Sequence, residues 1–182
     1  MKKIKIFLAS SEELRQERLE LAGLIGRMNV ILEPKDIHIY LVKWEYLDSS
    51  MSELHKQEEY NRVLEQCDIC LVLFWNRFGK YTKTEFDRAL ARSREGDKKR
   101  MELLIYFKEA NEDNEDLRAF KNQCEGMLPS NCRQIADIQS FKETFLKDFN
   151  AYQSQYLENE CELKFNEKTV TLDGMLILNL NK

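Results

Sequence analysis

Two segments of the sequence place polar and aromatic side chains directly after a β-rich apolar stretch. Ser10 and Ser11 follow the first such stretch, and the segment from Trp75 to Glu85 follows the most apolar stretch of the chain. Serine hydroxyls can contact a ribose or a phosphate, and an aromatic ring can stack on a base. Glu85 adds a carboxylate near the first turn of an expected helix, where the dipole favours an anion. Helix capping is the structural alternative for the serines and for Glu85.

Thiol and metal chemistry have weaker support in the sequence. Cys67 and Cys70 have the C-x-x-C spacing of redox and metal pairs, but Cys70 falls inside the most apolar run, where buried thiols are common. No second such pair completes a zinc site, and the only histidines are His38 and His55. Neither polar segment contains a glycine-rich dinucleotide-binding motif or a P-loop. We therefore expect free buried thiols and no metal.

The overall composition excludes several classes of protein. A net charge of −4 and a pI near 5.4 do not suit a general nucleic-acid binder, which needs a basic face. No apolar run reaches the roughly 18–20 residues of a membrane span. The basic and apolar start resembles a signal peptide, but it is short and Ser10 to Glu13 interrupt it. We expect a first strand in a cytoplasmic protein without nucleic-acid or membrane partners.

The elements that must position these residues alternate between strand and helix patterns. This alternation predicts an α/β fold with a flavodoxin-like five-stranded parallel sheet and helices on both faces. The third strand, as the most apolar, is expected at the centre. The expected strands cover residues 3–9, 37–44, 68–75, 100–107 and 135–138. Helices are expected from residue 11 to a break at 29–35, at 52–66, from a cap at Thr82 or Thr84 to about 94, at 111–123 and at 141–156.

The strand order decides whether the two polar segments meet. In the order 2-1-3-4-5 the switch point lies between strands 1 and 3, and ligands bind beyond the carboxyl ends of the strands. That order would bring Ser10, Ser11 and the segment from Trp75 to Glu85 to one cleft. We expect residues 1–158 to form this domain. Residues 159–182, with a turn signal at Asp173-Gly174, are expected to form a short β-hairpin appendage or the start of a missing module.

Five motifs taken together resemble a bacterial branch of the TIR superfamily. The resemblance covers about residues 3–157, and the order and spacing of its motifs are specific together although each alone is weak. The motifs are Ile6–Arg18, Trp44–Asp48, Gln57–Tyr60, Cys67–Trp75 and Phe78–Phe86.

The resemblance implies a catalytic residue. TIR enzymes have a catalytic glutamate on the helix after the third strand, and Glu85 matches that position. The usual Trp or Cys three residues earlier is replaced by Thr82. The expected substrate-binding residues are Ser10, Ser11, Trp44, Asp48, Phe74, Trp75, Phe78, Tyr81 and Thr82.

The resemblance also implies an activity. Such domains are similar to NAD+-consuming effectors of anti-phage defence, in which self-association completes the site and a sensor or NTPase module can be attached. NAD+ would be the substrate of a glycohydrolase or ADP-ribosyl cyclase, with no further cofactor. Because nicotinamide leaves as a neutral base, one carboxylate that stabilises the oxocarbenium charge is sufficient. In TIR domains the loop after strand 2, here Trp44–Ser50, gates the site and forms assembly contacts.

Two other functions remain open on the sequence alone. A nucleoside 2-deoxyribosyltransferase-like enzyme would use a glutamate on the corresponding helix to form a covalent sugar intermediate. It would need a supporting carboxylate, for which Asp48 and Asp68 are the candidates. The non-enzymatic alternative is a TIR interaction module whose cleft has no catalytic role.

Overall fold

The computed structural model describes residues 1–43, 62–76, 80–94, 101–109, 114–157 and 160–180, and the statements below concern these residues. The chain divides into two compact units, which we describe separately. The first consists of Met1–Lys3, Arg15–Ile39 and Ile135–Lys182, and the second of Ile4–Leu14 and Tyr40–Gln134.

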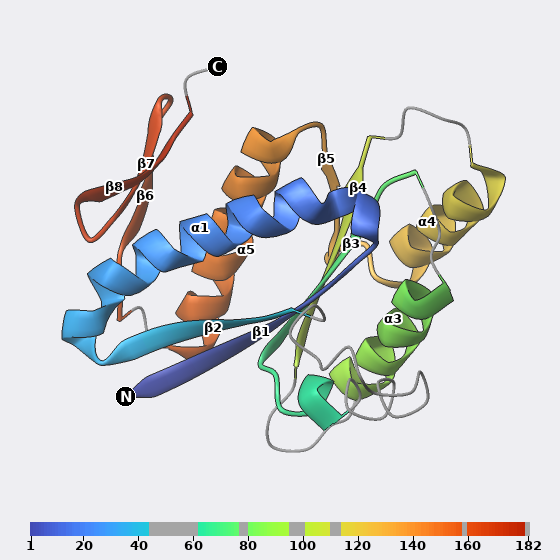
Figure 1. The fold of residues 1–182 in the computed structure, drawn as a ribbon, viewed down its shortest axis with the longest axis horizontal. Coiled ribbons are helices and arrows are strands. Elements are labelled where there is room, and N and C mark those ends of the chain that lie inside the picture. Colours follow the sequence, from blue (N-terminus) through green and yellow to red (C-terminus); the bar gives the residue numbers. More distant parts are fainter. Residues whose placement is uncertain (44–61, 77–79, 95–100, 110–113, 158–159, 181–182) are drawn as a thin grey trace. The chain divides into compact units, whose positions relative to one another are not determined.

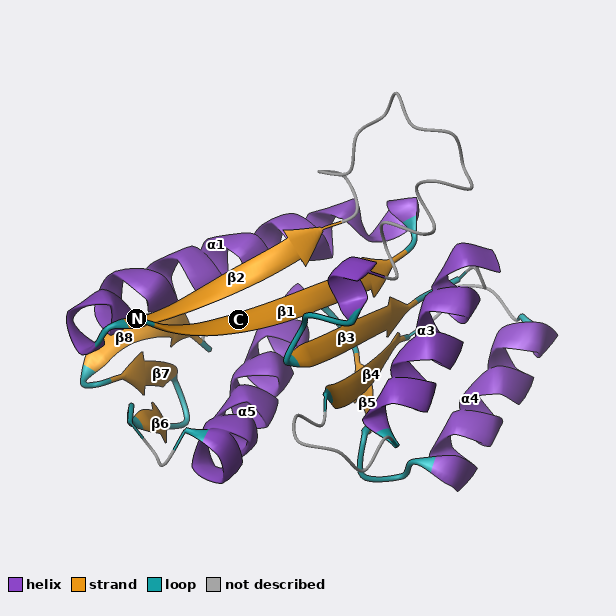
Figure 2. Cartoon of the chain, turned by 90° about the horizontal axis from the view of Figure 1, so that it is seen from below, coloured by secondary structure: helices purple, strands orange, loops and turns teal. Residues whose placement is uncertain are grey.

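Five strands form the main sheet (Figures 1 and 2). Their order is β2-β1-β3-β4-β5, and β3 pairs in parallel with both β1 and β4. This order confirms the expected flavodoxin-like α/β fold. The strands are β1 (Lys2–Ser10), β2 (Ile37–Lys43), β3 (Ile69–Phe74), β4 (Glu102–Lys108) and β5 (Cys132–Ile135).

An aromatic cluster forms much of the core of the second unit. Every residue of β3 is buried, and Phe74 at its end stacks on Phe107 of β4 at 5.4 Å between ring centroids. Helix α4 (Glu115–Met127) contributes Phe120, which meets Phe74 edge-on at 5.2 Å. Helix α3 (Lys80–Ser93) packs against β3 and β4, and its Phe86 meets Phe120 at 5.0 Å. These contacts fix both helices beside β3 and β4.

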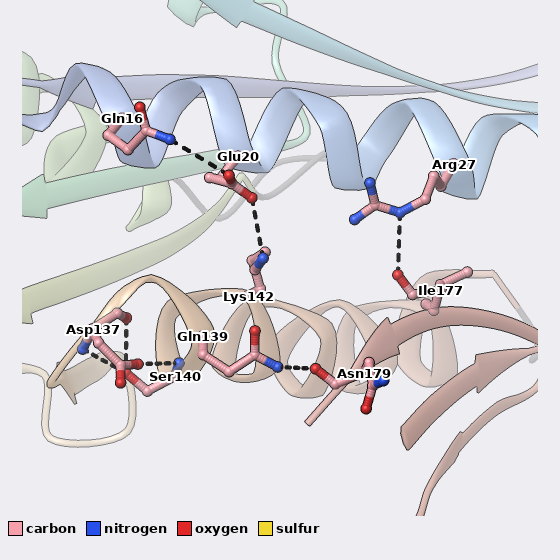
Figure 3. Close-up of polar contacts among 9 residues, drawn as sticks. All are labelled: Gln16, Glu20, Arg27, Asp137, Gln139, Ser140, Lys142, Ile177 and Asn179. Carbon is pink, nitrogen blue, oxygen red and sulfur yellow. Dashed lines mark hydrogen bonds and ion pairs between the residues drawn. The ribbon is translucent and has the colours of Figure 1, made fainter. Parts of the chain in front are cut away.

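In the first unit, helix α1 (Arg15–Leu32) packs against α5 (Ile138–Tyr156) and against β8 of a small C-terminal sheet. Figure 3 shows the polar contacts at these junctions. Glu20 and Lys142 form an ion pair between the two helices at 3.1 Å, while Arg27 donates to the carbonyl of Ile177 at 3.2 Å. Side chains of α1 and α5 thereby reach the C-terminal strands, because Gln139 also donates to the carbonyl of Asn179.

The C-terminal sheet has three antiparallel strands instead of a two-stranded hairpin. They are β6 (Leu163–Phe165), β7 (Thr169–Leu172) and β8 (Met175–Asn179), in that order. The additional strand arises from a second turn between Phe165 and Thr169, where the Asn166 N–H donates to the Thr169 carbonyl at 2.9 Å. The predicted turn is confirmed, since Asp173 and Gly174 both have positive φ, as a two-residue hairpin turn requires.

Several helix boundaries differ from the sequence expectation. Helix α1 follows a short 3-10 turn at Glu12–Leu14 and ends at Leu32, inside the expected break at residues 29–35. Helix α3 begins at Lys80, so the expectation that Thr82 or Thr84 caps it is wrong. The fifth strand ends at Ile135 instead of starting there, and α5 begins after Asp137, whose capping box with Ser140 sets the boundary. The helix expected at 52–66 lies mostly outside the described residues.

Candidate functional site

The candidate site lies where β1 and β3 end. Strand β1 ends at Ser10 and β3 at Phe74, and the parallel register pairs Ser10 with Leu73. Because β1 is bordered by β2 on one side and by β3 on the other, the switch point of the sheet falls between β1 and β3. Open α/β sheets bind ligands beyond the carboxyl ends of the strands at this point. Ser10 and Trp75 therefore occupy neighbouring positions at the expected ligand edge.

The two serines lie at the junction between β1 and the turn that leads into α1. Ser11 has a local role, since its hydroxyl donates to Glu13 at 3.1 Å and its carbonyl accepts from the Leu14 N–H. Those bonds hold the 3-10 turn that leads into α1. Ser10 is 7% exposed and ends the strand itself. Ligand contact by either serine stays a prediction.

The aromatic residues at the end of β3 also have different surroundings. Phe74 is 2% exposed inside the aromatic cluster with Phe107 and Phe120, so packing accounts for its side chain. Trp75 is half-buried, and its indole N–H donates to the carbonyl of Glu109 at 2.9 Å. The Lys108 ammonium lies 3.9 Å from the centroid of the Trp75 ring, a cation–π arrangement that orients the indole.

The structure places the backbone of Glu85 on α3, the helix that follows β3. Because α3 begins at Lys80, the backbone of Glu85 lies in its second turn and not in its first. The side chains of Tyr81, Thr82 and Glu85 are not among those described. Trp44, Asp48 and Phe78 lie outside the described residues altogether, and their roles stay predictions.

Asp68 lies at the opposite end of β3 from the candidate site. Its carboxylate accepts the backbone N–H of Lys5 at 2.8 Å, and the residue is 6% exposed. Asp68 directly precedes β3 and Trp75 directly follows it, so seven residue steps of roughly 3.3 Å, about 23 Å in all, separate the two residues. This distance argues against a role for Asp68 in sugar chemistry at the carboxyl ends of β1 and β3.

Asn114 makes two side-chain hydrogen bonds near this edge that the sequence did not predict. Its side-chain oxygen accepts the Leu117 N–H at 3.0 Å as the N-cap of α4, and its amide nitrogen donates to the Asn76 carbonyl at 3.1 Å. An asparagine followed by Glu115 and Asp116 is a recognisable helix start. Only the sheet order, however, brings Asn76 within reach of that cap.

Thiol and metal chemistry find no support in the described part of the chain. Burial raises the pKa of Cys124 to about 12 and that of Cys161 to about 11, and it also raises the pKa of Cys132. These thiols remain protonated at neutral pH and are therefore poor nucleophiles. Among the described residues, no three His, Cys, Asp or Glu side chains gather to hold a metal ion. None of the described helices has the length and apolar character to cross a bilayer.

No protein-family model and no curated protein matches the chain. The crystal structure of the RPS4 and RRS1 TIR domain heterodimer is similar at 13% identity and a TM-score of 0.49, over 85% of this chain and 99% of that one. The flavodiiron protein from Giardia intestinalis matches at 8% identity and a TM-score of 0.46, over 88% of this chain and 38% of that one.

Oxidised flavodoxin 1 from Bacillus cereus matches at 11% identity and a TM-score of 0.40, over 86% of this chain and 99% of that one. At these identities and scores the three likenesses do not assign a family or a function. The strand order β2-β1-β3-β4-β5 itself establishes the flavodoxin-like class.

Proposed function

We propose that the protein is a TIR-like NAD+ glycohydrolase or ADP-ribosyl cyclase that acts at the carboxyl edge of β1 and β3. One observation supports this most. The sheet has its switch point between β1 and β3, so Ser10 and Trp75 follow neighbouring strands at the edge where open α/β sheets bind ligands, and α3, which carries Glu85, comes next in the chain. The motif resemblance in the sequence adds the assignment of Glu85 as the catalytic carboxylate.

The chemistry requires only one carboxylate at this edge. When the nicotinamide–ribose bond breaks, the bonding electrons stay with the departing ring, which leaves as neutral nicotinamide. Glu85 would stabilise the positive charge that develops on the ribose. Water then adds to the sugar and loses a proton, giving ADP-ribose, or an adenine nitrogen adds and closes a ring. Ser10 would contact the ribose, and Trp75 would stack on a base. NAD+ is thus the substrate, and no cofactor is needed.

The structure weakens the deoxyribosyltransferase alternative. That reaction needs a carboxylate to support the nucleophile, and Asp68 is tied to Lys5 at the far end of β3. Asp48 is the remaining candidate, and it lies outside the described residues. A non-catalytic interaction module is the other possible outcome of the experiment below.

Self-association and cellular role complete the proposal. We propose that the loop Trp44–Ser50 docks on a neighbouring copy and completes the site, so that the isolated monomer has little activity. Such a restraint suits an anti-phage effector, because unrestrained loss of NAD+ is toxic. A sensor or NTPase module would supply the activating signal in the cytoplasm.

The direct test incubates purified protein with NAD+ and, separately, with deoxynucleosides, and follows released bases by chromatography. We expect nicotinamide release from NAD+ and no base exchange. Glu85→Gln should lower turnover by at least about a hundredfold, as loss of transition-state charge stabilisation does. Asp87→Asn is the matched control, because it removes an exposed carboxylate from the same helix, where Asp87 forms an ion pair with Lys83 one turn away at 2.7 Å. Near wild-type turnover by folded Glu85→Gln would remove Glu85 from the mechanism.

The second test varies protein concentration over a hundredfold range, with and without a crowding agent. We expect specific activity to rise with concentration, since a hundredfold range corresponds to about 2.7 kcal/mol of assembly free energy. Constant specific activity over that range would show a self-sufficient monomer.

A further inference from the structure

The side-chain amide of Asn114 connects the start of α4 with the residues that follow β3, because its oxygen and its nitrogen bond different partners. The oxygen accepts the Leu117 N–H at 3.0 Å and caps α4, while the nitrogen donates to the Asn76 carbonyl at 3.1 Å. The cap fixes the orientation of the amide, because only the oxygen can accept from Leu117. The NH₂ group must then face Asn76, the second residue after β3.

A neighbouring pair of contacts fastens the residue before it. The indole N–H of Trp75 donates to the Glu109 carbonyl at 2.9 Å, and the Lys108 ammonium lies 3.9 Å from the centre of the indole ring. Consecutive residues after β3 are thus attached to the last residue of β4 and to residues that follow it. The pairing of β3 with β4 continues in this way beyond the last paired residues, Phe74 and Phe107.

We propose that Asn114 is a positioning residue for the ligand edge and acts through Asn76. By holding the first residues after β3 against the start of α4, it sets the place from which the chain proceeds to α3 and Glu85. Small displacements of a substrate-facing segment have large effects on turnover, since catalysis depends on orientation. The expected effect of Asn114 on catalysis rests on the proposed function. Its expected effect on the position of the residues after β3 rests on the hydrogen bonds alone.

The two roles of Asn114 explain why asparagine is the cap residue here. Asparagine, aspartate, serine and threonine all cap helices, because each offers a side-chain acceptor. Aspartate has the same shape but no donor for the Asn76 carbonyl. Asn114→Asp therefore keeps the cap and replaces the bond to Asn76 with an unfavourable contact between two oxygens, whereas Asn114→Ala removes both the cap and the bond.

The experiment compares three variants with the wild-type protein. They are Asn114→Asp, Asn114→Ala and the control Asp116→Asn, which changes an exposed charge in the same helical turn. Urea unfolding midpoints report on the cap. Steady-state kinetics with NAD+ report on the ligand edge. Acrylamide quenching of Trp75 fluorescence, in a Trp44→Phe background used for this measurement only, reports on the segment after β3, because the chain has two tryptophans.

We expect Asn114→Asp and Asn114→Ala to lose about fivefold in kcat/KM, the value of one neutral hydrogen bond, and to show greater quenching of Trp75. Asn114→Ala should lower the urea midpoint more than Asn114→Asp, because it also removes the cap, and Asp116→Asn should change neither kcat/KM nor the quenching of Trp75. If Asn114 had only a structural role, the loss of kcat/KM would follow the loss in urea midpoint and would be smaller in Asn114→Asp than in Asn114→Ala. Equal losses of kcat/KM in the two variants would instead indicate positioning through Asn76.

Unchanged kcat/KM in Asn114→Asp, with an active wild-type enzyme, would overturn the catalytic part of the inference. Unchanged Trp75 quenching would overturn the positioning itself. If wild-type protein cleaves no NAD+ under any condition, the proposed function fails, and the quenching result alone decides whether Asn114 positions the segment.

Discussion

Asp68 offers a test of the claim that one end of β3 is structural and the other functional. Its buried carboxylate accepts the Lys5 N–H at 2.8 Å. The backbone continues the pairing, since the Asp68 N–H donates to the Lys5 carbonyl at 2.8 Å and the Glu102 N–H donates to the Asp68 carbonyl at 2.9 Å. The side chain therefore closes the start of the ladder between β1 and β3.

The expected cost follows from this bond. A hydrogen bond to a charged group contributes about 1.5–3 kcal/mol, and Asp68→Ala also leaves the Lys5 N–H without its side-chain acceptor. We expect Asp68→Ala to lower the free energy of unfolding by about 2–3 kcal/mol. Asp68→Asn keeps an acceptor oxygen and should cost only about 1 kcal/mol. Turnover per folded molecule should be unchanged in both, because the ligand edge lies about 23 Å away.

Urea unfolding followed by circular dichroism measures the first quantity, and NAD+ cleavage below the unfolding transition measures the second. A loss below about 0.5 kcal/mol in Asp68→Ala, within the range of ordinary surface substitutions, would contradict the hydrogen bond. A folded Asp68→Asn protein with more than about tenfold lower kcat, equivalent to about 1.4 kcal/mol of barrier, would contradict the separation of the two ends.

Two further predictions concern stability. The Asn29 side chain bonds both backbone groups of Ile39, accepting from its N–H at 2.8 Å and donating to its carbonyl at 2.9 Å. Asn29→Ala should lower the unfolding free energy by about 1.5 kcal/mol, from two bonds of about 1 kcal/mol each less about 0.5 kcal/mol of helix propensity, and an unchanged urea midpoint would refute this. Burial raises the pKa of Cys124 from 9.0 to about 12, so the folded state favours its protonated thiol. That contribution is complete below pH 9 and is lost as the pH rises through 12, so Cys124→Ala should show a shallower loss of stability over this interval than wild type; parallel curves would contradict it.

The sequence by itself determined the features that depend on neighbouring residues. The continuous apolar run from Ile69 to Phe74 predicted a fully buried central strand, because only a strand covered on both faces needs no polar side. Asp173-Gly174 predicted the turn between β7 and β8, since positive φ is a local backbone property. The strand–helix alternation predicted the sheet class, and the order 2-1-3-4-5 was an expectation that the structure confirmed.

Only the tertiary structure decided which polar groups meet across the fold. Asp68 bonds Lys5, 63 residues away, and Asn114 bonds Asn76, 38 residues away. Neither partner can be found from spacing, because each depends on which strand lies beside β3 and in which register. The start of α3 at Lys80 likewise moved Glu85 into the second turn of its helix. Local preferences act over a few residues, whereas hydrogen bonds between elements form only after the sheet has brought their ends together.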